Sequence, residues 1–153
     1  MTVSVRSFDH VGLTVPDLDE AIGLFISVFG ATELYRFGRE NDPELMETRI
    51  GVHPQASFQA AMLELTPAVY VELFQWRSPG QQARMPSPAD VGGHHLCVVV
   101  DDFNAAVAAL RDHPAVQVYG DGGHLGLGRH AGRRWIYVRT RWGLQIELIG
   151  AQA

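Results

Sequence analysis

The sequence contains an internal repeat, and this repeat limits the possible folds more than any other feature. Residues 10–21 align without a gap with residues 95–106. Each copy has apolar and β-branched residues after a histidine, and then a turn with an aspartate, Asp17 or Asp102, that can cap a helix. Each copy is therefore predicted to form a strand, a turn and a helix.

Three strand-like runs follow each predicted helix, so the repeating unit is βαβββ. Apolar residues at spacings of three and four predict a first helix that ends at Gly30, and a second helix over residues 102–111. The further strands are predicted at residues 32–37, 57–65 and 69–76 in the first copy, and at 116–119, 134–139 and 144–149 in the second. The expected fold class is α+β, with two tandem βαβββ modules in one structural domain.

Proline- and glycine-rich segments separate these elements. Residues 77–93 have almost no periodicity, so we interpret them as a surface linker between a first module at 1–76 and a second at 94–153. Residues 120–132 are polar and rich in glycine, and they are expected to form a surface loop. Within this loop, His124, Arg129 and His130 are candidate contacts for an anionic or polyhydroxylated substrate, although surface positions explain them equally well.

Four side chains share the strand faces that point away from the predicted helices. Side chains alternate along a strand, so His10 lies opposite Leu13 in the first module, and Glu72 lies opposite Val71 and Leu73. The repeat gives His95 and Glu147 the same positions in the second module. Two curved sheets related by a pseudo-twofold axis would bring these four side chains together.

An ionised carboxylate on an otherwise apolar face needs a compensating positive charge. All 12 basic residues of the chain are arginines, and none of them lies on the four strands that carry His10, Glu72, His95 and Glu147. A divalent cation is therefore the expected partner, held by these two histidines and two glutamates. The absence of lysine also excludes Schiff-base chemistry and a phosphate-binding loop that depends on lysine.

Composition narrows the class of protein further. The chain has 153 residues, a formal charge of −5 and one cysteine, Cys97, which can form neither an intrachain disulfide nor a cysteine-based zinc site. No apolar run reaches the roughly 18–20 residues of a membrane span, and the N-terminus does not resemble a signal peptide. We expect a cytoplasmic protein that binds a small molecule and neither nucleic acid nor membrane.

The sequence resembles the vicinal oxygen chelate superfamily, which includes glyoxalases, bleomycin resistance proteins and extradiol dioxygenases. The segments FDHVGLTVPDLDEA, YVELFQW, GGHHLCVVVDDFNAAVAAL and WGLQIELI carry this resemblance, and they extend from Phe8 to Ile149. The resemblance implies paired βαβββ modules around a cupped, half-barrel metal site. Carried over residue by residue, the metal ligands are His10, Glu72, His95 and Glu147.

The ligand set is similar to that of glyoxalase I and close to that of methylmalonyl-CoA epimerase. We therefore expect an epimerase or isomerase that moves a proton α to the carbonyl of a small hydroxy-ketone, sugar-like ketone or acyl-CoA. Glu147 is the first candidate for the base and Glu72 the second. The alternatives are a glyoxalase-type lyase, an extradiol-type dioxygenase and a binding or resistance protein without catalysis. The metal would be Zn, Mn, Co, Ni or Fe(II).

The resemblance admits modules paired within one chain or exchanged between two chains. The linker of residues 77–93 is long and contains several prolines, which favours both half-sites coming from one chain. A homodimer is still expected, because unpaired edge strands are a liability in a domain of this size.

Overall fold

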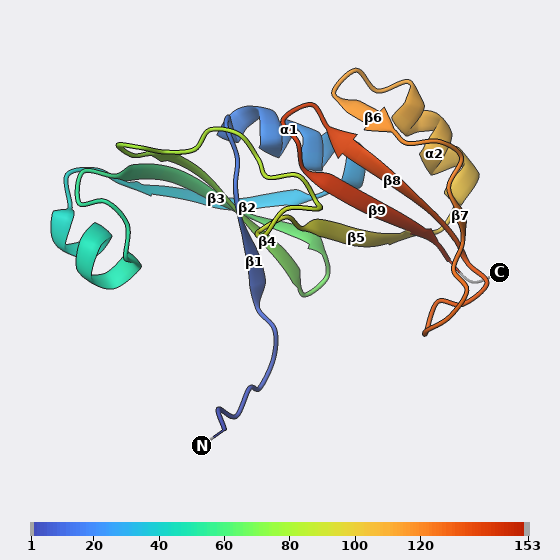
Figure 1. The fold of residues 1–153 in the computed structure, drawn as a ribbon, viewed down its shortest axis with the longest axis horizontal. Coiled ribbons are helices and arrows are strands. Elements are labelled where there is room, and N and C mark those ends of the chain that lie inside the picture. The colour runs from blue at the N-terminus through green and yellow to red at the C-terminus, as the bar shows by residue number, and fades with distance from the viewer. Residues whose placement is uncertain (1, 152–153) are drawn as a thin grey trace. The chain divides into compact units, whose positions relative to one another are not determined.

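The structure, a computed structural model, describes residues 2–151 as two compact units. The division falls between Gln81 and Gln82, within the segment that the sequence predicts as a linker. The expected module limits of 1–76 and 94–153 stay a prediction. Each unit consists of a helix and an antiparallel meander that is closed by one parallel strand pair (Figure 1). Both units are therefore α+β, as the repeat predicts.

The first unit contains a four-stranded sheet in the order β1-β4-β3-β2. Its strands are β1 (His10–Thr14), β2 (Thr32–Arg39), β3 (Ser57–Thr66) and β4 (Val69–Arg77). β1 and β4 run parallel with Gly12 opposite Glu72, whereas β2, β3 and β4 are antiparallel neighbours. The first and last strands of the unit are therefore adjacent, which positions the side chains discussed below.

Helix α1 (Leu18–Phe29) has the ends that its sequence predicts. The Asp17 carboxylate accepts a hydrogen bond of 2.8 Å from the backbone N–H of Glu20, which satisfies one of the unpaired donors at the start of the helix. At the other end Gly30 adopts a left-handed conformation, with φ of 69°, and its N–H donates to the carbonyl of Ile26. The predicted helix and both of its caps are confirmed.

The apolar side of α1 packs on one face of this sheet and forms the core of the first unit. Alternation along the strands sends every second side chain into this layer, so the strand residues of the core are two positions apart. The fully buried members are Leu13, Val15, Leu18, Ala21, Ile22, Phe25, Leu63, Val71 and Leu73. His10 and Glu72 point to the opposite face, as predicted from the sequence.

The segment between β2 and β3 contains a π-helical turn, η1 (Leu45–Ile50), that the sequence did not indicate. This turn lies at the far end of β2 and β3 (Figure 1). Its buried Met46 packs with Phe58 and Ala60, and Phe74 and Trp76 border the same cluster. The segment therefore covers part of the sheet face that α1 leaves free. It has no periodic apolar pattern of its own, so its position depends on contacts with residues that are remote in the sequence.

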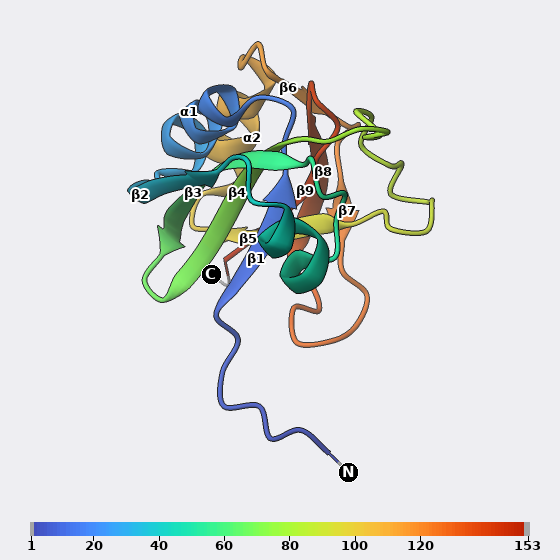
Figure 2. The same ribbon diagram turned by 90° about the vertical axis from the view of Figure 1, so that its left-hand side faces the viewer.

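The second unit repeats this plan with the strand order β5-β9-β8-β6. Its elements are β5 (His95–Val100), α2 (Phe103–Arg111), β6 (Val116–Val118), β7 (Gly123–His124), β8 (Arg134–Thr140) and β9 (Gln145–Gly150). β5 and β9 are parallel, and α2 packs against β6 and β9 (Figure 2). Among the described residues, no helix has the length and apolar character needed to cross a membrane.

The expectation of a continuous loop over residues 120–132 is wrong at one place, because β7 lies inside it. Gly123 and His124 pair with Trp135 and Arg134 of β8. Gly122 allows this close approach, since its φ is 70° and a Cβ atom there would lie 2.0 Å from the carbonyl oxygen of Trp135. A strand of two residues has too little alternation to be recognised in a sequence.

We expect Gly122→Ala to destabilise the protein more than the matched substitution Gly128→Ala. Gly128 has a similar φ of 82° but open space around it, so alanine there costs only the left-handed strain, about 1–2 kcal/mol. At Gly122 the clash with Trp135 adds about 1–3 kcal/mol. Urea unfolding of the two variants measures the difference, and equal free energies of unfolding would contradict the close approach of β7 to β8.

Candidate metal and catalytic site

His10 and Glu72 form a close pair in the first unit. The Nε2 atom of His10 lies 3.2 Å from Oε2 of Glu72, across the parallel strands β1 and β4. The glutamate side chain is only 16% exposed, compared with 36% for the histidine. Because a shielded carboxylate is costly without a compensating charge, this pair forms a site that favours a cation.

Asp9 fixes the orientation of the His10 ring. Its carboxylate accepts a 2.7 Å hydrogen bond from Nδ1, which directs Nε2 of the same ring toward Glu72. The hydrogen bond that His10 donates to Asp9, followed by the negative charge of Glu72, raises the pKa of His10 above its usual value. In many metal sites, the histidine nitrogen that does not bind the metal donates its N–H to a carboxylate in this way.

His95 and Glu147 form the equivalent pair in the second unit. Nε2 of His95 lies 3.3 Å from Oε2 of Glu147, and the glutamate side chain is again the more buried, at 13% exposed. The neighbouring His94 instead places its Nδ1 atom 3.1 Å from the carbonyl oxygen of Gly92. The structure thus forms two contacts among the four predicted ligands, one in each unit.

The two glutamates have different neighbours. Met62 is the cross-strand partner of Glu72, whereas Tyr137 is the partner of Glu147. The Tyr137 ring also contacts His95 edge to face, with the ring centroids 5.4 Å apart. Burial and the Glu147 charge raise the pKa of Tyr137. The sequence did not single out Tyr137. Its alternation with Ile136 and Val138, which are buried, indicates that it points to the face opposite the core, where Glu147 lies.

Cys97 is exposed and lies opposite Glu147 in the β5–β9 pairing. Cysteine is usually a buried residue, but here it lies on β5, an edge strand of the sheet. Loss of hydration, followed by the charge of Glu147, raises the pKa of the thiol to about 11. The thiol is therefore protonated near neutral pH, which does not favour a nucleophilic role.

The chemistry of both pairs fits a divalent cation. Two ligand atoms with bonds of about 2.1 Å to one metal are separated by about 3 Å, which is close to the observed nitrogen–oxygen distances. No group of three or more histidine, cysteine, aspartate or glutamate side chains is arranged to hold a metal within residues 2–151. Each unit on its own therefore supplies a pair of ligands.

The three candidate loop residues have different environments. His124 is exposed on β7, and its backbone pairs with Arg134. The Nε atom of Arg129 donates to Nε2 of His130 at 3.1 Å. Loss of hydration and the charges of Arg133 and Arg129 lower the pKa of His130, so its ring is neutral near pH 7. No hydrogen bond or ion pair joins these three side chains to the His95–Glu147 pair, although the charge of Glu147 acts on the His130 ring.

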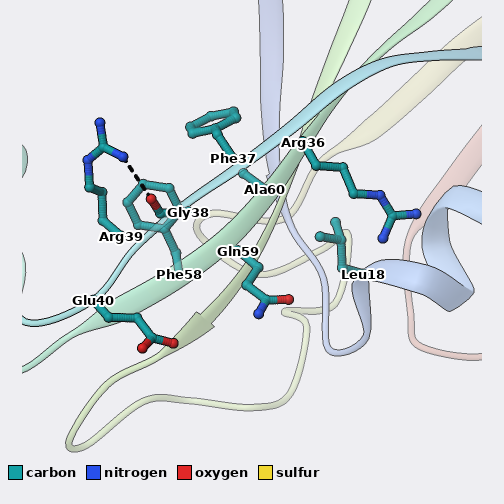
Figure 3. A pocket seen from close by; sticks show the side chains of 9 residues that line it. All are labelled: Leu18, Arg36, Phe37, Gly38, Arg39, Glu40, Phe58, Gln59 and Ala60. Atoms are coloured by element: carbon teal, nitrogen blue, oxygen red, sulfur yellow. Dashed lines mark hydrogen bonds between the residues drawn. The ribbon is translucent and has the colours of Figure 1, made fainter.

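The first unit contains a cavity of about 350 Å³ between the start of α1 and the strands β2 and β3 (Figure 3). Arg36 pairs with Ala61, and Ala61 with Leu73, so Arg36 shares the sheet face that α1 covers. Its guanidinium already contacts the carboxylates of Asp19 and Glu33. The cavity is lined by Leu18, Arg36, Phe37, Gly38, Arg39, Glu40, Phe58, Gln59 and Ala60. None of the four candidate ligands lines it.

Comparison with known proteins identifies the family. Residues 9–137 match the family model described as the Glyoxalase/Bleomycin resistance protein/Dioxygenase superfamily. The chain belongs to this superfamily.

A curated relative carries a specific activity in its name. The chain is 41% identical over 144 residues to a 2-epi-5-epi-valiolone epimerase from Actinomyces sp., with 94% of this chain and 79% of the relative covered.

Solved structures support the fold. A glyoxalase family protein from Bacillus cereus matches with a TM-score of 0.76 and 21% identity, covering 99% of this chain and 97% of the other. A fosfomycin resistance protein from Listeria monocytogenes, complexed with Mn(II) and sulfate, matches with a TM-score of 0.59 and 13% identity, covering 97% and 95%. The predicted vicinal oxygen chelate fold is thereby confirmed, and the Listeria protein of similar fold is seen with a divalent metal.

In the metal-free protein, we expect Asp9→Asn to lower the pKa of His10. Asp9 contributes most to the raised value, and asparagine keeps the shape without the charge. The His10–carboxylate interaction stabilises the fold below the usual histidine pKa, and this stabilisation is lost as the pH rises through the raised pKa. A ring-proton NMR titration measures the change.

Asp19→Asn is the matched control, because Asp19 is an exposed carboxylate of the same unit that contacts Arg36. This control should leave the His10 titration unchanged. A His10 pKa that is the same with and without Asp9 would refute the orienting contact.

Proposed function

We propose that this protein is a divalent-metal-dependent epimerase that moves the proton α to the carbonyl of a sugar-like cyclic ketone. The observation that carries the proposal is the equivalent placement of one histidine–glutamate pair in each unit, at 3.2 Å and 3.3 Å. The 41% identical relative, named as an epimerase of a cyclic polyol ketone, supports the reaction class and a small-molecule substrate.

In this proposal the histidine–glutamate pairs of both units hold one metal ion together, through His10, Glu72, His95 and Glu147. Imidazole nitrogens and carboxylate oxygens suit Zn, Mn, Co, Ni and Fe(II) alike. When bound, the divalent metal is a Lewis acid that stabilises the negative charge developing on the substrate oxygen. The Mn(II) complex of a structural neighbour supports a metal of this class.

The two glutamates supply the proton transfers. Glu147 takes the proton from the carbon beside the carbonyl, because its side chain is the more buried of its pair, at 13% exposed, and shares the sheet face with His95. Inversion requires that a proton returns to the opposite face of that carbon, and Glu72 in its protonated form donates it. The turnover leaves Glu147 protonated and Glu72 ionised, and proton exchange with water restores both. Two bases on two faces distinguish an epimerase from a lyase of the glyoxalase type, which returns the proton to a neighbouring carbon.

We infer further that both half-sites come from one chain and that the protein forms a homodimer. The segment of residues 77–93 contains prolines that favour an extended surface path over a tight hinge for exchange. The edge strands β2 and β6 of the two sheets support association, because unpaired strand edges favour pairing with another surface.

We expect chelator-treated protein to take up one equivalent of one of these metals, and His10→Ala or Glu147→Ala to abolish this uptake. If the four ligands share one metal ion, either substitution should prevent both pairs from holding it. Metal analysis after dialysis measures the stoichiometry. In a mixture of the two variant chains, uptake should stay absent; restored uptake would mean that half-sites are shared between chains.

The matched control is His94→Ala, because His94 is adjacent to His95 but contacts the Gly92 carbonyl instead of Glu147. It should bind the metal as the unmodified protein does. A protein that takes up none of the five metals with better than millimolar affinity would exclude the proposed site.

We expect the metal-loaded protein to incorporate deuterium from heavy water into 2-epi-5-epi-valiolone at the carbon α to its carbonyl. Glu147→Gln should slow this exchange by roughly 100- to 10,000-fold, the usual contribution of a general base. NMR follows the exchange and the appearance of the epimer.

Glu44→Gln is the control, since Glu44 is an exposed residue that pairs with Arg49. It should leave the exchange rate unchanged. Consumption of dioxygen would identify a dioxygenase instead, an isomerised product without epimer would identify lyase-type chemistry, and tight binding without exchange would identify a binding protein.

A further inference from the structure

The sheet of the second unit carries two adjacent rows of polar side chains on the face that bears His95 and Glu147. The strand register defines both rows, because directly paired residues point to the same face of a sheet. Pairing of Arg139 with Gln117 and Gln145, and of Gln145 with His95, gives the first row. The second row consists of Tyr119, Tyr137, Glu147 and Cys97. The polar surface therefore extends from β5 across β9 and β8 to the residue after β6.

Arg139 is a half-buried cation in the first row. Its Nη2 atom donates to Oε1 of Gln145 at 2.9 Å, and its guanidinium carbon lies 5.1 Å from the centre of the Tyr119 ring. Tyr119 in turn contacts Gln117 through its hydroxyl. These contacts hold the guanidinium in one position above the sheet.

The hydrogen bonds of Arg139 are incomplete. Its Nε atom is buried and has no hydrogen-bond partner, and no carboxylate in the described part of the chain lies within 4.0 Å of the guanidinium. A guanidinium has five N–H donors, and shielding them from water without acceptors is unfavourable. The Nε atom itself is out of reach of a ligand, so the oxygen atoms of a bound ligand would meet the outer N–H groups of the half-buried guanidinium.

Arg134 shows that this arrangement is specific to one face. It lies on the same strand, and its guanidinium also covers an aromatic ring, with 4.4 Å between its carbon and the Phe103 ring centre. Its Nη1 atom donates to Asn104 of α2, so it belongs to the helix side of the sheet. Arg134 is exposed there, so water is available to its other donors.

The position and charge of Arg139 indicate the ligand group. Arg139 and His95 are two strands apart, or about 10 Å between backbones, which is the scale of a substituted six-membered ring. Phosphate and acidic groups are usually bound by clusters of arginines. Here one arginine is accompanied by the neutral polar side chains of Gln117, Gln145 and Tyr119, which suits hydroxyl groups.

We propose that Arg139, positioned by Gln145 and Tyr119, binds ring hydroxyl oxygens of the substrate and selects polyhydroxylated cyclic ketones. This role rests on the proposed epimerase function and adds its specificity. The reacting end of the ring lies at the His95–Glu147 pair, and the hydroxyl groups remote from it lie over Gln145 and Arg139.

The test compares two ring ligands that do not react. One is the polyol in which an alcohol replaces the carbonyl of 2-epi-5-epi-valiolone, and the other is cyclohexane-1,2-diol, which lacks the remaining hydroxyl groups. Calorimetric titration of the metal-loaded protein should show that Arg139→Met weakens polyol binding roughly 10- to 100-fold, as expected for lost hydrogen bonds to a charged group. Affinity for the simple diol should not change. Arg139→Lys should restore part of the difference.

Arg134→Met is the matched control and should change neither affinity, and metal content should be the same in all variants. No binding of the polyol to the unmodified protein, or equal weakening of both ligands by Arg139→Met, would overturn the role of Arg139. Inorganic phosphate that binds more tightly than the polyol and depends on Arg139 would also overturn it, in favour of an anion site. Deuterium exchange by the unmodified protein tests the epimerase proposal separately, so the two failures can be told apart.

Discussion

The parallel pairing of the first and last strand of each unit is the constraint on which the rest of the arrangement depends. It aligns Gly12 with Glu72 and Cys97 with Glu147. Each histidine lies two residues before this glycine or cysteine, and therefore on the same face of the sheet as the glutamate. The same pairing directs Leu13, Val71, Ile146 and Leu148 into the layer beneath the helices. The buried core on one face therefore fixes the register that brings a histidine to a glutamate on the other, because a slip of one residue would exchange the two faces.

The repeat produces similar backbones with different local chemistry. His10 is oriented by the carboxylate of Asp9, whereas the residue before His95 is another histidine whose ring contacts a backbone carbonyl. Across from the glutamates, Met62 in the first unit corresponds to Tyr137 in the second. The first half-site is therefore flanked by apolar groups and the second by groups that form hydrogen bonds.

Much of the fold follows from patterns that extend over several residues. The alternation of strands and the three- and four-residue spacing of helices predicted both modules, the caps at Asp17 and Gly30, and the shared face of His10 and Glu72. What the sequence did not predict depends on contacts between segments that are remote in the chain. The turn η1 is fixed by Met46 against aromatic residues of β3 and β4, and β7 exists only because Gly122 admits β8. The sequence did not single out Arg139 among the 12 arginines, because its contacts with Gln145 and Tyr119 come from neighbouring strands.

The closure of each unit by its outermost strands also has a consequence for folding kinetics. His10 pairs with Tyr70, 60 positions later, and His95 with Gln145, 50 positions later. Such non-local contacts form late, after the hairpins between them, since they require the largest loss of chain entropy. The entropic penalties of the two closures differ by only about 0.2 kcal/mol by the logarithmic dependence on loop length. The two halves of the chain should therefore fold at comparable rates, and each histidine should reach its glutamate only in the last step of folding.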